Sequence, residues 1–207
     1  MSTCILVVGI HRSGTSAAAG VLFHLGVPMG KEFLPPMHQN PKGFFEDLKL
    51  MRIQDAMIGD WRNPSPRGLH PNYVQAIRER SKQPLWGFKY PRTCYTLPIF
   101  CEVFQGKVKI LHIVRPREDV ILSLATRDLT MESATRVHDI YDINKKKNLE
   151  KAEKQGIPIL TIRYDDMIDD SARIVDTIKK FVYTDGRDVN IETAVNFIDP
   201  LLRRSRA

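Results

Sequence analysis

Residues 12–16 of this chain combine a guanidinium with three hydroxyl groups, in the order Arg12, Ser13, Gly14, Thr15 and Ser16. Arginine presents a planar, permanently charged fork that grips phosphate or sulfonate oxygens. The hydroxyls of Ser13, Thr15 and Ser16 add further hydrogen-bond donors. This segment therefore predicts a binding site for a phosphate-like anion.

The flanking residues place the segment between a strand and a helix. Residues 3–8 form a run of β-branched and aliphatic side chains, which is typical of a strand buried on both faces. Small and apolar residues over 15–25 suit a helix packed on a sheet. The free N–H groups and the positive dipole end of such a helix favour an anion. The alternative is an ordinary strand–turn–helix with a glycine for tight packing.

The spacing from Gly9 to Gly14 is similar to that of the nucleotide-triphosphate loop G-x-x-x-x-G-K-S/T. Thr15 stands where that loop has its lysine, and Arg12 supplies the positive charge from inside the loop. The segment therefore departs from the triphosphate loop at the residue that contacts the terminal phosphates.

Two further basic residues lie at the ends of predicted strands. Lys89 ends the apolar run at 85–89, and Arg115 follows the run at 108–114. In an open parallel sheet, ligands bind beyond the carboxyl ends of the strands. We therefore expect Arg12, Lys89 and Arg115 to build one positive crevice, unless these strand ends are basic by accident.

The loop Arg12-Ser13-Gly14-Thr15-Ser16 resembles the 5′-phosphosulfate loop of the sulfotransferase superfamily. Residues 115–123 are similar to that family's 3′-phosphate segment, in which a strand-end arginine and a helical serine clamp the phosphate. Arg115 and Ser123 stand at those two positions. The resemblance implies 3′-phosphoadenosine 5′-phosphosulfate (PAPS) as cofactor, adenosine 3′,5′-bisphosphate as product, and no metal requirement.

Two weaker segments, at residues 40–46 and 87–92, resemble the bacterial and carbohydrate-type branch of that family. The resemblance implies transfer of a sulfuryl group to a hydroxyl or amine by in-line displacement. Arg12 and Lys89 would neutralise charge on the leaving oxygen. The fold implied is that of P-loop nucleotide hydrolases.

A base must remove the acceptor's proton. The small-molecule branch uses a histidine two residues beyond its lysine, but Pro91 occupies that position here. Glu46 is our candidate, because the carbohydrate-type branch has a glutamate after its first loop and helix. His11, His38 and Asp47 are its rivals. An acidic helix N-terminus, stabilised by the dipole, would also explain Glu46 and Asp47.

Strands and helices are expected to alternate along the chain, which predicts an α/β domain with a parallel sheet flanked by helices. We expect strands at residues 3–8, 85–89, 108–114 and 159–163. We expect helices at 15–25, 48–58, 71–82, 93–104, 116–127, 130–155, 171–183 and 191–197, with Ser171 as a cap.

The 207 residues suit a single domain over 1–207, and the net charge of +7 suits an anionic ligand. No apolar stretch is long enough to span a membrane, and no charged segment precedes the first apolar run. Three cysteines without metal-ligand spacing predict a reduced, cytoplasmic protein. Lysines 145–147 are read as a solvated helix face, so nucleic acid is not an expected partner.

The expected acceptor is a small molecule or a carbohydrate, and the sequence leaves its identity and the oligomeric state open. Trp61 either lines the acceptor pocket or packs in the core. Residues 203–206, which are mostly arginine, are either a loose tail or a further contact to the 3′-phosphate.

Two other functions fit the same pattern. A P-loop kinase or other nucleotide-triphosphate enzyme would need the missing loop lysine and an acidic residue after residues 108–114 to hold magnesium. A non-catalytic nucleotide- or nucleic-acid-binding module would place its basic residues along an exposed face rather than at strand ends.

Overall fold

A parallel β-sheet lies at the centre of the computed structural model, which describes residues 1–38 and 40–202. Its strands in this part of the chain are Thr3–Val8 (β1), Leu85–Lys89 (β2), Lys107–Val114 (β3) and Ile159–Arg163 (β4). They are adjacent in the order β2-β1-β3-β4, and every neighbouring pair is parallel. The predicted α/β fold, with a parallel sheet flanked by helices, is confirmed.

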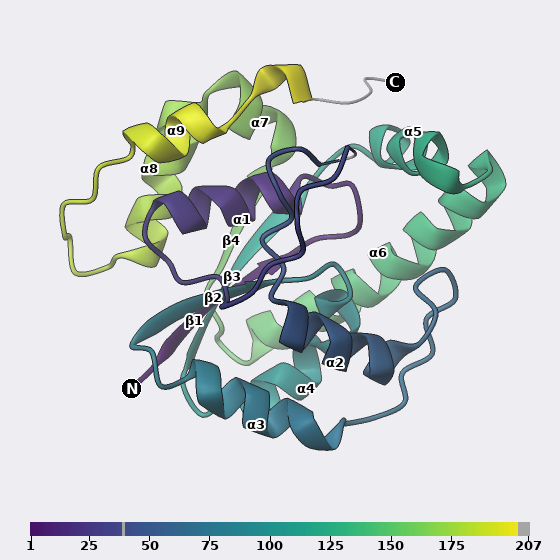
Figure 1. The fold of residues 1–207 in the computed structure, drawn as a ribbon, viewed down its shortest axis with the longest axis horizontal. Coiled ribbons are helices and arrows are strands. Elements are labelled where there is room, and N and C mark those ends of the chain that lie inside the picture. Colours follow the sequence, from purple (N-terminus) through teal and green to yellow (C-terminus); the bar gives the residue numbers. More distant parts are fainter. Residues whose placement is uncertain (39, 203–207) are drawn as a thin grey trace.

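Helices connect the strands and cover both faces of the sheet (Figure 1). Their bounds are Thr15–His24 (α1), Leu48–Ile58 (α2), Pro71–Arg80 (α3), Thr93–Val103 (α4), Arg117–Asp128 (α5), Met131–Lys154 (α6), Tyr164–Asp169 (α7), Ser171–Val182 (α8) and Glu192–Phe197 (α9). A 3-10 turn, η1, spans Pro200–Leu202. Within residues 1–38 and 40–202, no helix has the length and apolar character needed to cross a membrane.

Alternate residues of β1 belong to two separate hydrophobic cores. Cys4, Leu6 and Val8 pack into the core that contains residues of α2 to α6. Ile5 and Val7 pack into the core that contains residues of α1, α7, α8 and α9. Figure 1 shows α1, α7, α8 and α9 on one side of the sheet and α2, α3, α4 and α6 on the other. Both faces are covered, which explains the uninterrupted apolar run of β1.

Asp47 fixes the long segment between α1 and α2. Its carboxylate accepts hydrogen bonds from the amides of Lys49 and Leu50, so it caps the N-terminus of α2. It also accepts a hydrogen bond from the amide of Lys31 and forms an ion pair with Arg80 of α3. These bonds hold Glu46, the residue before Asp47, against the carboxyl end of the sheet.

One additional helix and one helix cap differ from the sequence prediction. Tyr164–Asp169 (α7) forms a short helix directly after β4, where none was expected. Asp170, rather than Ser171, caps α8, because its carboxylate accepts a hydrogen bond from the amide of Arg173. Ser171 is already the first residue of the helix, so the capping position falls to the residue before it.

The lysine run on α6 is only partly solvated. Lys146 and Lys147 are exposed, but Lys145 is buried and its ammonium lies 2.7 Å from Asp142 Oδ1. The prediction of a uniformly solvated face is therefore wrong at Lys145, which the helical period turns toward the sheet. The predicted contact of residues 203–206 with a 3′-phosphate lies outside the described residues.

Candidate functional site

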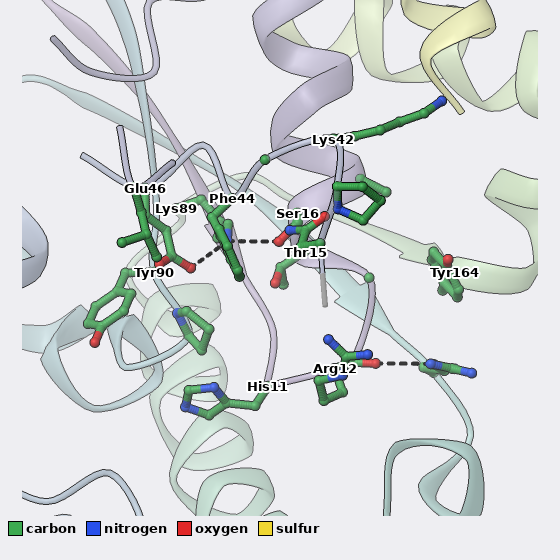
Figure 2. A pocket seen from close by; sticks show the side chains of 18 of the residues that line it. His11, Arg12, Thr15, Ser16, Lys42, Phe44, Glu46, Lys89, Tyr90 and Tyr164 are labelled. Carbon is green, nitrogen blue, oxygen red and sulfur yellow. Dashed lines mark hydrogen bonds and ion pairs between the residues drawn. The ribbon is translucent and has the colours of Figure 1, made fainter. Parts of the chain in front are cut away.

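The loop between β1 and α1, where the sequence predicts an anion site, lies at the carboxyl end of the sheet (Figure 2). Gly14 is the N-cap of α1 with a φ of 95°, a left-handed conformation that suits glycine. No side chain of the described residues caps the first turn of α1, whereas α2, α3, α6 and α8 each have such a cap. The N-terminus of α1 therefore keeps its N–H groups available for a ligand.

The loop hydroxyls point in two directions. Thr15 and Ser16 line a cavity of about 280 Å³ at the carboxyl end of the sheet, together with Arg12 and Gly14. Ser13 is buried, and its hydroxyl donates to the carbonyl of Ile10 at 2.8 Å. Two of the three predicted hydroxyl donors thus face the cavity, while Ser13 braces the turn.

Arg115 reaches the same loop from the end of β3. Its Nη1 donates to the carbonyl oxygen of Arg12 at 3.2 Å, and its Cζ lies 5.2 Å from the centroid of the Tyr164 ring. Ser123 on α5 is buried and accepts a hydrogen bond from Nε of Arg12 at 2.9 Å. Arg115 and Ser123, expected to act together, are therefore joined through Arg12. Arg115 lines the cavity, whereas Ser123 does not.

Lys89 ends β2 beside the last residues of β1, with its side chain buried at the base of the cavity. Its Nζ lies 2.6 Å from Glu46 Oε1 and 3.0 Å from Ser16 Oγ, and both contacts are drawn as dashed lines in Figure 2. Burial lowers the pKa of Lys89, and the neighbouring Glu46 carboxylate opposes that shift. A cation and a carboxylate thus meet at the first turn of α1.

The rival bases occupy different surroundings. The carboxylate of Asp47 caps α2 and forms an ion pair with Arg80, and Asp47 does not line the cavity. His38 is exposed and lies outside the cavity lining. His11 lines the cavity, but burial, and secondly the charge of Arg92, lowers its pKa to about 3. The imidazole of His11 is therefore neutral near pH 7 and a weak base.

The structure gathers the cationic side chains expected from three strand ends into one cavity. Arg12, Lys89 and Arg115 all line it, together with the carboxylate of Glu46, which pairs with Lys89. The cavity sits beyond the carboxyl ends of the strands, where open parallel sheets bind ligands. The full lining is His11, Arg12, Gly14, Thr15, Ser16, Ala17, Leu34, Asn40, Pro41, Lys42, Gly43, Phe44, Glu46, Met51, Lys89, Tyr90, Pro91, Arg115, Arg127, Tyr164, Ile168, Phe197, Ile198 and Asp199.

Tyr164, Lys42 and Arg127 are among the lining residues that were not expected as site residues. Tyr164 follows the last residue of β4, so the strand-end rule that selected Lys89 and Arg115 would also have selected it. Lys42 donates to the carbonyl of Phe197 at 2.6 Å and so ties the α1–α2 segment to α9 across the cavity. Arg127 lies one turn beyond Ser123 on α5, a placement that only the tertiary structure reveals.

Comparison with known proteins gives the fold a precedent. No protein-family model and no curated protein matches this sequence. Among solved structures, the chain is similar to the sulfotransferase domain of the olefin synthase of Synechococcus PCC 7002, with a TM-score of 0.57 and 17% identity. That match covers 98% of this chain and 86% of the other. It shows that this chain has the sulfotransferase, P-loop-like fold.

Two structures of retinol dehydratase are also similar, one with retinol and PAP and one with androsterone and inactive cofactor PAP. Their TM-scores are 0.46 and 0.44, with identities of 12% and 13%. This chain spans 64% of the length of each retinol dehydratase chain. Scores at this level do not by themselves establish a common fold.

Proposed function

We propose that this protein is a sulfotransferase that moves a sulfuryl group from PAPS to a hydroxyl or amine of an acceptor. One observation carries the proposal: cations from three strand ends, Arg12, Lys89 and Arg115, converge on an uncapped helix N-terminus in a single cavity. The loop lacks the lysine of triphosphate loops, because Thr15 occupies that position. Such a site suits two separate anionic groups better than a triphosphate chelated to magnesium.

The residues of the cavity fit the two ends of adenosine 3′,5′-bisphosphate. The amides at the start of α1 and the hydroxyls of Thr15 and Ser16 would hold the 5′-phosphosulfate. Arg115 would hold the 3′-phosphate, with Ser123 connected to it through Arg12. PAPS supplies an activated sulfuryl group with a good leaving phosphate.

Sulfuryl transfer needs a base for the acceptor's proton and a cation for the leaving oxygen, and Glu46 and Lys89 are placed for these two roles. The new bond forms between sulfur and the acceptor oxygen or nitrogen, and the bond from sulfur to the 5′-phosphate oxygen breaks. Glu46 would take the acceptor's proton, and Lys89 with Arg12 would neutralise the charge left on the phosphate oxygen. The 2.6 Å contact between Lys89 and Glu46 keeps base and cation at the same point of the cavity.

The position of the cavity supports one class of acceptor. The expected acceptors are small molecules or carbohydrates, since the space beside Glu46 and Lys89 is enclosed by the segment around Pro41 and Phe44. We also propose that this protein belongs to the bacterial and carbohydrate-type branch of the sulfotransferase family.

Calorimetric titration with adenosine 3′,5′-bisphosphate, and separately with ATP and magnesium, tests the proposal. We expect the bisphosphate to bind without magnesium and ATP to bind weakly. Binding of ATP that requires magnesium would favour the kinase alternative. Binding of the bisphosphate without turnover of any acceptor in a broad panel would favour a non-catalytic nucleotide-binding module.

A further inference from the structure

A second cavity, of about 270 Å³, lies next to the proposed nucleotide site. His11 and Arg127 line both cavities, so the two spaces share a wall. The second cavity draws its lining from the β1–α1 loop, the segment after α2, the N-terminus of α4 and the end of α5. Its residues are His11, Trp61, Arg62, Arg92, Leu124, Arg127 and Leu129.

The charged side chains that line the second cavity are all cationic. Three arginines line it, and no carboxylate does. Arg92 is already engaged, since its Nη1 lies 2.9 Å from Asp55 Oδ1 and 2.7 Å from the carbonyl of Gly59. Arg62 and Arg127 form no ion pair with any residue in the described part of the chain. Two guanidinium groups beside one cavity thus lack a protein counter-charge, which favours an anionic ligand.

The remaining lining residues are His11, Trp61 and two leucines. Nε2 of His11 is buried and makes no hydrogen bond with any described residue. The His11 ring is held between Trp61 and Tyr141, with centroid distances of 5.1 and 4.9 Å. Because burial keeps this imidazole neutral near pH 7, it offers a ligand a hydrogen bond rather than a charge. Leu124 and Leu129 complete an apolar wall.

We propose that this second cavity binds an anionic group, a carboxylate or a phosphate, carried on the apolar or aromatic skeleton of the acceptor. Arg62 and Arg127 pair with the anion, Trp61 and the leucines contact the skeleton, and His11, which lines both cavities, lies at their boundary. An acceptor bound in this way reaches Glu46 and Lys89 with its hydroxyl or amine. The inference rests on the proposed function and specifies its substrate class.

Trp61 provides a direct readout of binding in this cavity. The chain has two tryptophans, and Trp86 is buried in the core away from both cavities. The titrants are 3-phenylpropanoate and its neutral analogue 3-phenylpropanamide, added with adenosine 3′,5′-bisphosphate at saturation so that anion sites in the first cavity are filled. We expect the carboxylate to bind about 10-fold more tightly or better, because a charge-assisted bond distinguishes the two probes.

Matched variants locate the effect. Arg62→Gln and Arg127→Gln are each expected to reduce the preference for the carboxylate to less than about 3-fold. Arg78→Gln removes the same charge from an exposed site on α3 and should leave the preference intact. Equal affinity for the two probes, binding of neither, or an unchanged preference in Arg62→Gln would overturn the proposal. 3-Phenylpropyl phosphate, titrated in parallel, shows whether a phosphate or a carboxylate is the better anion.

The same preparation separates this inference from the proposed function. If the bisphosphate binds but the carboxylate is not preferred, the sulfotransferase proposal stands and the acceptor inference fails. If the carboxylate is preferred in an Arg62-dependent manner but the bisphosphate does not bind, the second cavity is an anion site and the sulfotransferase proposal fails. Thermal unfolding of each variant verifies that the titrated protein is folded.

Discussion

Lys89 and Glu46 form a buried ion pair at the carboxyl end of the sheet, with Nζ 2.6 Å from Oε1. The same ammonium lies 3.0 Å from Ser16 Oγ in the first turn of α1. One cation therefore joins the proposed base to the proposed phosphosulfate cradle. The pair is costly to bury, so removing either partner alone has consequences for both folding and chemistry.

Glu46→Gln tests the proposed base. The amide keeps the shape of the side chain but cannot take a proton, so kcat is expected to fall by about 10²–10⁴-fold. The affinity for adenosine 3′,5′-bisphosphate should change by less than about 3-fold, since Glu46 is not proposed to contact the nucleotide. The measurements are steady-state rates with the best acceptor from a panel of phenols and alcohols, and calorimetry. An unchanged kcat would transfer the role of base to another group, with His11 the nearest candidate in the cavity.

The ion pair itself is tested by a double-mutant cycle. Lys89→Met leaves the Glu46 carboxylate buried without its partner and is expected to lower the free energy of unfolding by about 3–5 kcal/mol. The combination with Glu46→Gln should recover more than half of that loss, because no buried charge is then stranded. Urea denaturation at pH 7.5 measures all four proteins. Additive effects of the two substitutions would show that the pair is not coupled.

Two constraints require a glycine at position 14: the backbone conformation of Gly14 and the ring of Tyr164 beside it. Its φ of 95° disfavours other residues, and an added Cβ would collide with the ring of Tyr164. Gly186 has a similar φ of 71° but open space around it, so Gly186→Ala measures the backbone cost alone, about 1–2 kcal/mol. We expect Gly14→Ala to lower the free energy of unfolding by clearly more and to abolish bisphosphate binding. Equal losses in the two variants would mean that the Tyr164 contact is unimportant.

Acid should destabilise the protein through His112 on β3. Burial, and secondly the charge of Lys145, lowers the pKa of His112 from 6.5 to about 4. The unfolded chain therefore binds the proton more readily, so this contribution to stability is fully present above pH 6.5 and is lost as the pH falls toward 4. His112→Gln should show a shallower fall of unfolding free energy over that interval in urea denaturation. The same slope in both proteins would contradict the burial of a neutral imidazole.

The strands were predictable because each follows an apolar or β-branched run, and β1 and β2 are buried on both faces. The convergence of Arg12, Lys89 and Arg115 on one cavity also followed from the sequence, since parallel strands end at one edge. The short helix α7 was not predicted, because a single stretch of six residues lacks a full apolar period.

The sequence could not predict the orientation of individual side chains or the presence of the second cavity. The inward turn of Ser13 depends on the loop conformation, which residue types do not specify. Trp61 was expected either to line an acceptor pocket or to pack in the core; it packs on the core of α2 to α6 and also lines the second cavity, the proposed acceptor site. That cavity is assembled from four segments far apart in the chain, and no local pattern marks it.

We expect this protein to distinguish a nucleotide that carries a 3′-phosphate from one that does not. Calorimetry with adenosine 3′,5′-bisphosphate and with adenosine 5′-monophosphate measures this most directly, using wild type, Arg115→Ala and the control Arg117→Ala. Arg117 is an exposed neighbour paired with Asp139, so its loss should not matter. The account predicts that wild type and Arg117→Ala bind the bisphosphate at least about 10-fold more tightly than the monophosphate, and that Arg115→Ala loses this preference. Equal affinity of the wild-type protein for the two nucleotides would contradict it.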